Sequence, residues 1–430
     1  MRCLGKPNFL PATPIKDINT LMRLRLWLFI LTTLVSSLSA GTTIISHGFV
    51  FPGKKPLEGW MQDMAKALCE RNSGGTIRLY DPATGAFEKI KTHEGDQSFN
   101  VLLFDWSADS NDPEEGHSEA AGNALFCSLL MGSRAGHFGL ESLHFIGHSR
   151  GCVVNSEAVE RLIRLGKPVE QMTFLDPHDW GLHVTHRDYS VNPPFINSGI
   201  EAWEGVTWAD AYWQEASIGL SGRPVNGAYS KKLDVTWHTD VFRWYTETIR
   251  NSGSKEGYYF SIRGGGSAHR PPRQGNAHPP YFAFLENSVY NGDFRFAPPL
   301  STRIPGWSHH GGAGAGHIQR NALELDRGNG RKQHDRFYIP KDATEIVFDL
   351  KCNNADRSSF DGIDHLLVSV DQTVFLKLQL NQTDDNFRRH SIDIKAFQDQ
   401  VVTLGFRIAG KSGKQSFITS QVKIDNVRLQ

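Results

Sequence analysis

A serine between two glycines is the first feature of this sequence that could do chemistry. Residues 147–151 read Gly-His-Ser-Arg-Gly, with an apolar run before them and a helix-compatible run after them. A serine hydroxyl is a poor nucleophile at neutral pH. It needs a histidine base, an acid that orients this histidine, and donors aimed at the developing oxyanion. Flanking glycines suit a tight turn between a strand and a helix, because side chains there would collide with neighbouring backbone. The pattern predicts Ser149 as a nucleophile if the other groups follow in the right order.

The acid is expected directly after a later strand, at the edge where open parallel sheets build their sites. The run "QMTFLD" (171–176) reads as a strand that ends in Asp176, and Pro177 prevents a simple continuation of the strand. Asp179 is the nearby alternative, although it also fits a solvated turn. We predict that Asp176 is the acid.

The base is sought among eighteen histidines. After a serine turn of this type the base follows the acid along the chain, which leaves His178, His183, His186 and His238 within residues 41–260. The first three come too soon after the strand for a separate loop to return to the site. His238 opens "HTDVFRWYTETI" (238–249), which reads as a helix. We predict His238 as the base, and the alternative is a surface histidine that caps this helix.

Two backbone N–H groups are expected to form the oxyanion hole. One belongs to the residue after the nucleophile, Arg150, and the other to a loop after an earlier strand. The segment "SHGF" (46–49) is placed for this role, so we predict the N–H of Phe49 as the second donor. Gly48 would let the backbone approach the substrate closely. The alternative is that residues 47 and 48 form a plain turn.

The elements that must position these groups alternate between apolar runs and helical patterns over residues 41–260. Asp112 is predicted to cap one of the helices, with Pro113 in its first turn. Buried strands that alternate with helices indicate an α/β domain, in which a mainly parallel sheet carries helices on both faces. The predicted strands are 42–49, 100–107, 142–147 and 171–176, and the predicted helices are 55–73, 111–136, 153–167 and the one that begins at 238.

The segment 177–237 is long for a connection and rich in aromatic residues. Two interpretations stay open. The segment is a lid or a wall of the acyl pocket, or its aromatics form a satellite core. Its tryptophans are Trp180, Trp203, Trp208, Trp213 and Trp237, and its tyrosines are Tyr189, Tyr212 and Tyr229.

The motifs "TTIISHGF", "LLFDWS", "LHFIGHSRG", "FLDP" and "HTDVFRWY" together resemble the lipase/esterase branch of the α/β-hydrolase superfamily, over about residues 42–250. The position of the acid is similar to that in animal-lipase-type enzymes. The resemblance implies Ser149 as nucleophile, Asp176 as acid and His238 as base. Arg150 departs from the Leu, Gln or Met that is often found there. We expect its cation near the entrance of the site, which would disfavour apolar lipids.

The character of the chain changes after residue 260. Residues 261–285 read as a Gly/Pro-rich linker, and residues 286–430 show short alternating runs typical of an antiparallel β-sandwich. The motifs "NSVYNGDF", "IPGW" and "VKIDNVRLQ" resemble galactose-binding-like and carbohydrate-binding jelly-roll modules. The resemblance implies a glycan partner and a structural Ca²⁺, for which Asp293 and Asp425 are suitable oxygen ligands. The alternatives are salt-bridged carboxylates and, for Trp307, a core position in place of sugar stacking.

Residues 1–40 have the order of a secretory signal peptide, with Met22 as an alternative start. Basic residues precede an apolar stretch that is short for a membrane span, and small residues follow it. Secretion to the extracellular space or the periplasm is the prediction, without a transmembrane segment after cleavage, and an uncleaved anchor is the alternative. The cysteines show no metal-ligand spacing and predict buried thiols, with one disulfide left open. They are Cys3, Cys69, Cys127, Cys152 and Cys352.

The charge balance of the sequence argues against two classes of binding partner. Lys plus Arg and Asp plus Glu each number 46, so no strong field would attract nucleic acid or an anionic membrane. The sequence as a whole predicts a secreted serine hydrolase that cleaves carboxylic esters or lipids through an acyl-enzyme and requires no cofactor. One alternative is an esterase directed at polysaccharides. The other is a secreted glycan-binding protein whose hydrolase domain is inactive.

Overall fold

The computed structural model describes most of the chain between residues 41 and 430. The predicted signal peptide 1–40, the alternative acid Asp179 and the alternative bases His183 and His186 lie outside the described residues. The described ranges are 41–50, 59–112, 116–178, 199–217, 220–296, 303–309, 317–326, 331–354, 364–380, 386–409 and 420–430.

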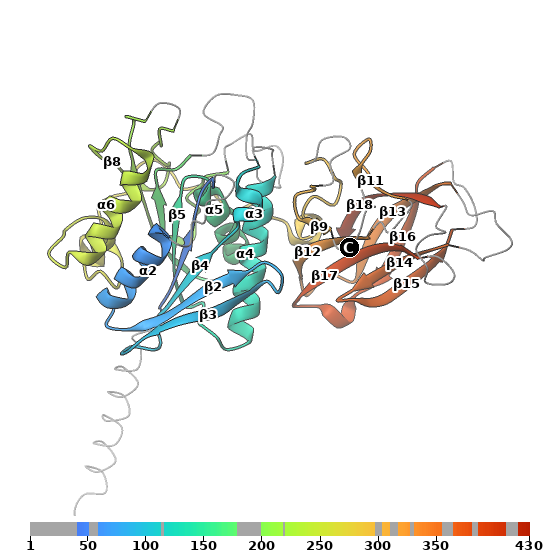
Figure 1. Cartoon of the computed structure of the whole chain (residues 1–430), viewed down its shortest axis with the longest axis horizontal. Helices are drawn as coiled ribbons and strands as arrows, with labels where there is room; N and C mark the ends of the chain where they lie inside the picture. Colours follow the sequence, from blue (N-terminus) through green and yellow to red (C-terminus); the bar gives the residue numbers. More distant parts are fainter. Residues whose placement is uncertain are drawn as a thin grey trace, which may run out of the picture. The chain divides into compact units, whose positions relative to one another are not determined.

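Eight strands of the described chain form one sheet over residues 41–232, in the order β3-β2-β4-β1-β5-β6-β7-β8 (Figure 1). Neighbouring strands are parallel, except that β2 and β3 form an antiparallel hairpin. The residues of β1 and β4 are buried throughout, as expected where helices cover both faces of a parallel sheet. The strands are β1 (Gly41–Ser46), β2 (Gly75–Asp81), β3 (Ala86–His93), β4 (Asn100–Phe104), β5 (Ser142–His148), β6 (Val169–Leu175), β7 (Val206–Trp213) and β8 (Tyr229–Lys232).

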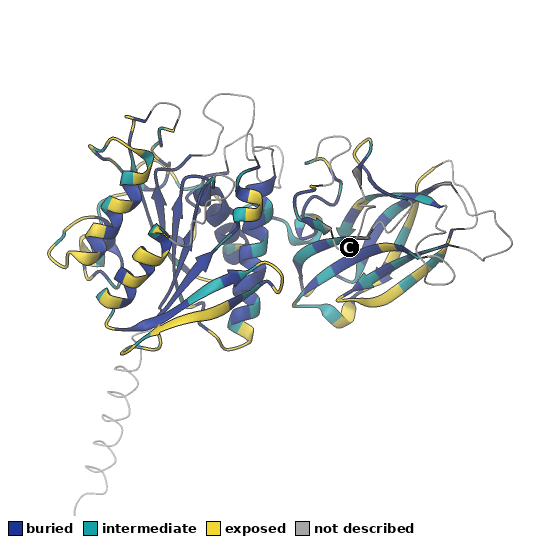
Figure 2. Ribbon diagram, in the orientation of Figure 1, coloured by how far each residue is buried: buried dark blue, intermediate teal, exposed yellow. Residues whose placement is uncertain are grey.

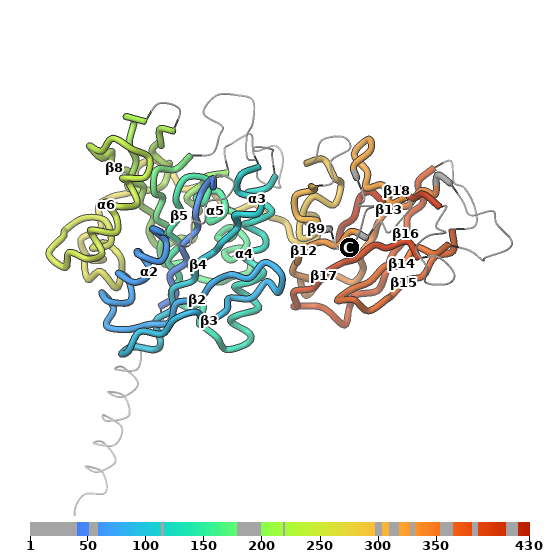
Figure 3. Tube along the Cα trace, in the orientation of Figure 1, coloured from blue at the N-terminus to red at the C-terminus, as the bar shows by residue number. Residues whose placement is uncertain are grey.

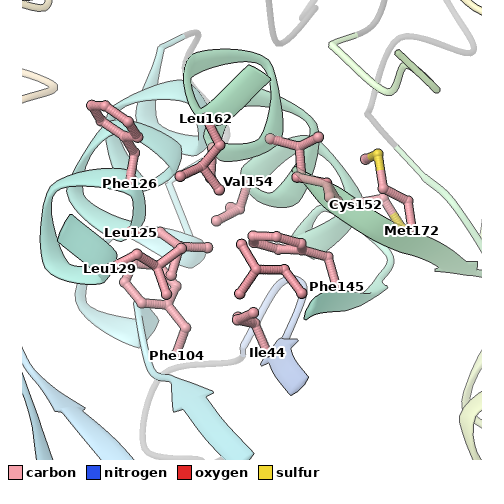
Figure 4. Close-up of a cluster of buried hydrophobic side chains, with 14 of the residues drawn as sticks. Ile44, Phe104, Leu125, Phe126, Leu129, Phe145, Cys152, Val154, Leu162 and Met172 are labelled. Carbon is pink, nitrogen blue, oxygen red and sulfur yellow. The ribbon is translucent and has the colours of Figure 1, made fainter. Parts of the chain in front are cut away.

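Two pairs of helices cover the two faces of this sheet. Ile44 on β1 belongs to a core with α4 and α5, which Figure 4 shows in close-up. The next residue, Ile45, belongs to a second core with α2 and α6, as the alternation of side chains along a strand requires. The predicted α/β class is therefore confirmed. The helices are α2 (Trp60–Arg71), α3 (Ser107–Ser110), α4 (His117–Arg134), α5 (Gly151–Arg164) and α6 (His238–Arg250), with short 3₁₀ turns η3 (Gly257–Phe260) and η4 (Ser267–His269).

The start of α4 differs from the prediction. The helix begins at His117 behind Gly116, whose φ of 92° is left-handed, so Asp112 does not cap it. Pro113 lies outside the described residues. The backbone of Asp112 instead accepts a hydrogen bond from Arg150 Nη1 at 2.7 Å.

Strands β7 and β8 were not predicted, and both lie in the aromatic segment 177–237. Trp208 and Tyr212 of β7 are buried in the domain core, as is Trp203 before this strand. These three side chains therefore belong to the main core of the domain and form neither a lid nor a separate satellite core. Trp237 is different, because 63% of it is exposed directly before α6. The residues 179–198, where a lid was the other interpretation, lie outside the described ranges.

The predicted linker lies against the α/β domain, and Figure 3 traces it through to the second domain. The backbone N–H groups of Tyr281 and Phe282 donate to Glu160 Oε1 of α5 at 2.7 and 2.9 Å. Phe282 is fully buried, and its carbonyl accepts from Arg164 Nε at 2.8 Å. The short helix α7 (Phe284–Asn287) follows.

The second domain is an antiparallel β-sandwich, as predicted. Its described strands form the sheets β10-β11-β18-β13-β16 and β15-β14-β17-β12-β9, with the apolar core between them. Figure 2 shows the alternation of buried and exposed residues along these strands. Trp307 is only 3% exposed and belongs to this core, so it is not placed to stack on a sugar. The strands are β9 (Trp307–His309), β10 (His317–Ile318), β11 (Leu323–Leu325), β12 (Arg331–Ile339), β13 (Glu345–Asn354), β14 (His365–Val370), β15 (Thr373–Gln379), β16 (Arg388–Asp393), β17 (Gln400–Ala409) and β18 (Gln421–Leu429), with the 3₁₀ turn η5 (Lys395–Phe397).

Two further observations concern the described part of the chain. It contains no helix that combines the length and the apolar character needed to cross a bilayer. Its four cysteines are buried thiols, and none of them forms a disulfide. These cysteines are Cys69, Cys127, Cys152 and Cys352.

Candidate active site

Ser149 lies on a strained turn between β5 and α5. Its φ of 56° is in the left-handed region, which costs a residue with a side chain about 1–3 kcal/mol. The N–H of Ser149 donates to Leu175 O at 3.0 Å. A Cβ on Gly151 would lie 2.4 Å from Ser46 O, so only glycine fits where the turn passes the end of β1. The serine is thus held at the carboxyl ends of the central strands.

Asp176 and His238 form a hydrogen-bonded pair. Asp176 directly follows β6, has a φ of 46° and is fully buried. Its Oδ2 lies 2.5 Å from His238 Nδ1, at the first residue of α6. A buried carboxylate at Nδ1 keeps the proton on this nitrogen and leaves Nε2 as the basic atom.

Gln214 completes the surroundings of Asp176 and was missed by the sequence analysis. Its backbone N–H donates to Asp176 Oδ1 at 2.9 Å, and its Nε2 donates to Oδ2 at 2.8 Å. The same side chain is held by Leu220 O at 3.0 Å and by the Ser217 N–H at 2.8 Å. Since Gln214 directly follows β7, recognition of that strand would have pointed to it.

His148 connects the nucleophile turn with the helix that carries His238. Its ring centroid lies 4.4 Å from that of His238, and its Nε2 lies 3.2 Å from His238 O. Burial, together with the nearby His238, lowers the pKa of His148 well below its usual value. His148 therefore stays neutral and does not repel positive charge on His238. The described contacts do not include a hydrogen bond between Ser149 Oγ and His238, a bond that often tightens only when substrate is bound.

His178, one of the alternative bases, also lies near the site. Its ring centroid is 6.2 Å from that of His238, and its Nδ1 lies 3.3 Å from Ser221 O. The carboxylate of Asp176 is bonded to His238 and not to His178 in the described contacts. His178 is therefore a neighbour of the Asp–His pair.

The predicted oxyanion loop lies directly against the serine. A Cβ on Gly48 would be 2.5 Å from Ser149 Cβ and 2.9 Å from Ser149 Oγ, so only glycine fits here. His47 Nδ1 lies 2.7 Å from Gly48 O, and because a carbonyl only accepts, Nδ1 carries a proton. In a trans peptide the C=O and N–H groups point in opposite directions. The bond to Gly48 O therefore fixes the direction of the Phe49 N–H.

The Arg150 side chain does not lie at the entrance, so this prediction was wrong. The residue is fully buried, and its Nη1 donates to Asp112 O at 2.7 Å and to Ser110 O at 3.1 Å. Its guanidinium carbon lies 5.5 Å from the centroid of the Trp106 ring. Backbone carbonyls and an indole face replace water around the cation, which makes this burial tolerable.

The predicted calcium ligands lie in the sandwich. Asp293 Oδ2 forms an ion pair of 2.7 Å with Arg295 Nε, which agrees with the salt-bridge alternative for this residue. Burial, with added repulsion from Asp293 and Asp349, raises the pKa of Asp425 to about 6. Among the described residues no group of three or more His, Cys, Asp or Glu side chains is arranged to hold a metal ion. The calcium site stays a prediction.

Comparisons with known proteins give similar structures at low identity. No family model and no curated protein matches the sequence. A gene product of Listeria innocua is 13% identical, with a TM-score of 0.34, and the match covers 52% of this chain and 93% of that chain. A candidate cell surface hydrolase of Lactobacillus plantarum is 10% identical, with a TM-score of 0.27 and coverages of 50% and 78%. A carbohydrate-binding module solved with β-1,4-galactotriose is 10% identical, with a TM-score of 0.19 and coverages of 27% and 74%.

Proposed function

We propose that this protein is a secreted serine hydrolase that cleaves carboxylic esters. The observation that carries the proposal is the buried carboxylate of Asp176 at 2.5 Å from His238 Nδ1, beside a serine held in a left-handed turn. These are the residue types that activate a hydroxyl for acyl transfer.

The residues act in two steps. His238 Nε2 takes the proton of Ser149 Oγ as this oxygen bonds to the ester carbonyl carbon. The N–H groups of Phe49 and Arg150 stabilise the oxyanion, and each such donor contributes about 3 kcal/mol. The alcohol leaves with the proton from His238. Water, deprotonated by His238, then releases the acid from the acyl-enzyme and restores Ser149.

Exposed apolar residues near the site favour an ester substrate with apolar groups. Trp237, next to His238, is 63% exposed. Leu220, whose carbonyl accepts from Gln214 Nε2, is 41% exposed. The exposed ring of Trp237, next to the base in the chain, favours a substrate that carries hydrocarbon there.

A panel of p-nitrophenyl esters with acyl chains of two to sixteen carbons tests this function. We expect the wild type to turn over at least part of the panel. Ser149→Ala should lower kcat at least 10⁴-fold, as expected for loss of a nucleophile. Ser128→Ala is the matched control, because its hydroxyl only donates to Ala124 O within α4. Equal activity of Ser149→Ala and wild type would contradict the proposal.

A second candidate is an esterase that acts on polysaccharide held by the sandwich. Exposed apolar residues on this domain favour it, since Phe375 on β15 is 43% exposed and Phe387 before β16 is 42% exposed. Aromatic rings on a surface are suited to pack against sugar rings. A pull-down of the full chain on insoluble glycans tests this. We expect Phe375→Ala with Phe387→Ala to lose binding, and equal retention of both proteins would oppose it.

A further inference from the structure

The Arg150 side chain is buried where the nucleophile turn meets the segment 105–112. This segment runs from β4 toward α4 and includes the short helix α3. Two of its carbonyls, those of Ser110 and Asp112, accept hydrogen bonds from the same Nη1. Hydrogen bonds from a charged donor are about twice as strong as neutral ones. The cation therefore holds the segment against the turn that carries Ser149.

Trp106 in this segment links the Arg150 side chain to the loop after β1. Its ring lies under the Arg150 guanidinium, and its Nε1 donates to His47 O at 2.6 Å. The indole and the His47 ring are stacked, with centroids 5.8 Å apart and planes 21° apart. Trp106 is only 4% exposed, so these contacts are shielded from water. His47 in turn holds the carbonyl of Gly48.

The segment 105–112 also has contacts with Arg303 and His117. Arg303 Nη2 donates to Ala108 O at 2.9 Å, and its Nη1 lies 3.3 Å from Asp112 Oδ2, but the Arg303 side chain is 53% exposed. His117 Nε2 lies 3.4 Å from the same Asp112 oxygen. These groups contact the Ala108 carbonyl and the Asp112 carboxylate, whereas Arg150 bonds to the carbonyls of Ser110 and Asp112.

We propose that the Arg150 side chain is a positioning residue for the oxyanion hole. The Arg150 side chain fixes the position of Trp106, and Trp106 fixes the position of His47. His47 in turn holds the peptide bond that bears the Phe49 N–H. One residue would thus supply one donor through its backbone and set the direction of the other through its side chain. The proposal rests on the proposed esterase function. It adds to that function the means by which the N–H groups of Phe49 and Arg150 keep a fixed position relative to each other.

Arg150→Met tests this role, because methionine keeps the backbone N–H and removes the charged donors. We expect kcat to fall about 100-fold, as for loss of one oxyanion donor, with KM within about threefold of wild type. The affinity for a trifluoromethyl ketone, which forms a tetrahedral adduct with the serine, should fall by a similar factor. Arg150→Lys should recover part of kcat, since it restores the charge without the planar fork.

Arg164→Met is the matched control. Arg164 is also on α5, and its Nε donates to a backbone carbonyl, that of Phe282, at 2.8 Å. Its loss should lower stability and leave kcat and ketone affinity within threefold of wild type. If Arg150→Met keeps kcat and ketone affinity within threefold of wild type while near-UV circular dichroism shows it folded, the proposal is wrong.

Trp106→Phe keeps the test decisive if Arg150→Met does not fold. Phenylalanine retains an aromatic ring and removes the donor to His47 O. We expect kcat to fall at least tenfold with KM unchanged, and an unchanged kcat would overturn the proposal. Failure of the proposed function would look different, because the wild type itself would then hydrolyse no ester.

Discussion

Replacement of Gln214 by methionine tests how the acid is held. The change keeps side-chain length and removes the bond from Nε2 to Asp176 Oδ2, while the Gln214 backbone N–H still bonds to Oδ1. It also leaves Leu220 O and the Ser217 N–H without their partner in the Gln214 side chain. Asp176 is fully buried, so water does not readily replace the lost donor.

The magnitude follows from these three bonds. A hydrogen bond to a charged group contributes about 1.5–3 kcal/mol to stability, and a neutral one about 1 kcal/mol. We expect the free energy of unfolding to fall by about 4 kcal/mol. We also expect kcat to fall about tenfold, because a carboxylate freed on one side no longer orients His238 as sharply, and a tenfold loss corresponds to about 1.4 kcal/mol in the barrier.

Urea unfolding and steady-state ester hydrolysis measure the two effects. Gln97→Met is the control, because Gln97 Nε2 donates to His93 O and Gly95 O at an exposed site. Its effect on unfolding should stay within about 0.5 kcal/mol. If Gln214→Met is as stable and as active as Gln97→Met, Gln214 does not hold the acid and our reasoning is refuted.

Three further predictions concern the oxyanion loop, a buried histidine and the sandwich. Gly48→Ala should lower kcat at least 100-fold in folded protein, because its Cβ would lie 2.5 Å from Ser149 Cβ, and steady-state kinetics with near-UV circular dichroism check this. Burial, with a smaller contribution from Arg270, lowers the pKa of His144 to about 3, so below about pH 6.5 the unfolded chain binds a proton that the folded chain does not. Stability from this group is therefore lost as the pH falls, and wild type should lose about 1.4 kcal/mol relative to His144→Gln between pH 7.5 and 5.5 in urea unfolding. If Asp293 and Asp425 bind Ca²⁺, millimolar CaCl₂ should raise the melting temperature over that in EDTA, and Asp425→Asn should abolish the rise.

The sequence was most informative where a polar residue ends a buried parallel strand. Ser149 and Asp176 directly follow β5 and β6, which are apolar runs of recognisable length. Neighbouring parallel strands end at the same edge of a sheet, so the two residues had to lie close together. The helix that begins at His238 could be recognised for another reason. Its apolar residues lie on one face, and this face packs into the core.

The remaining features depend on contacts that no local pattern encodes. Strand β7 was hidden because its many aromatics suggested a separate segment, and Gln214 was missed with it. Strand β3 has mostly exposed residues, so it lacks the apolar run by which buried strands are recognised. The burial of Arg150 depends on carbonyls of Ser110 and Asp112, about forty residues earlier in the chain.

Labelling with a fluorophosphonate tests the central claim most directly. This reagent phosphonylates a serine only when a base and an oxyanion hole activate it. The account predicts one adduct per chain, located by fragmentation on Ser149 within the tryptic peptide 135–150, and lost in both Ser149→Ala and His238→Gln. Folded wild-type protein that stays unlabelled, or that carries the adduct on another residue, would contradict it.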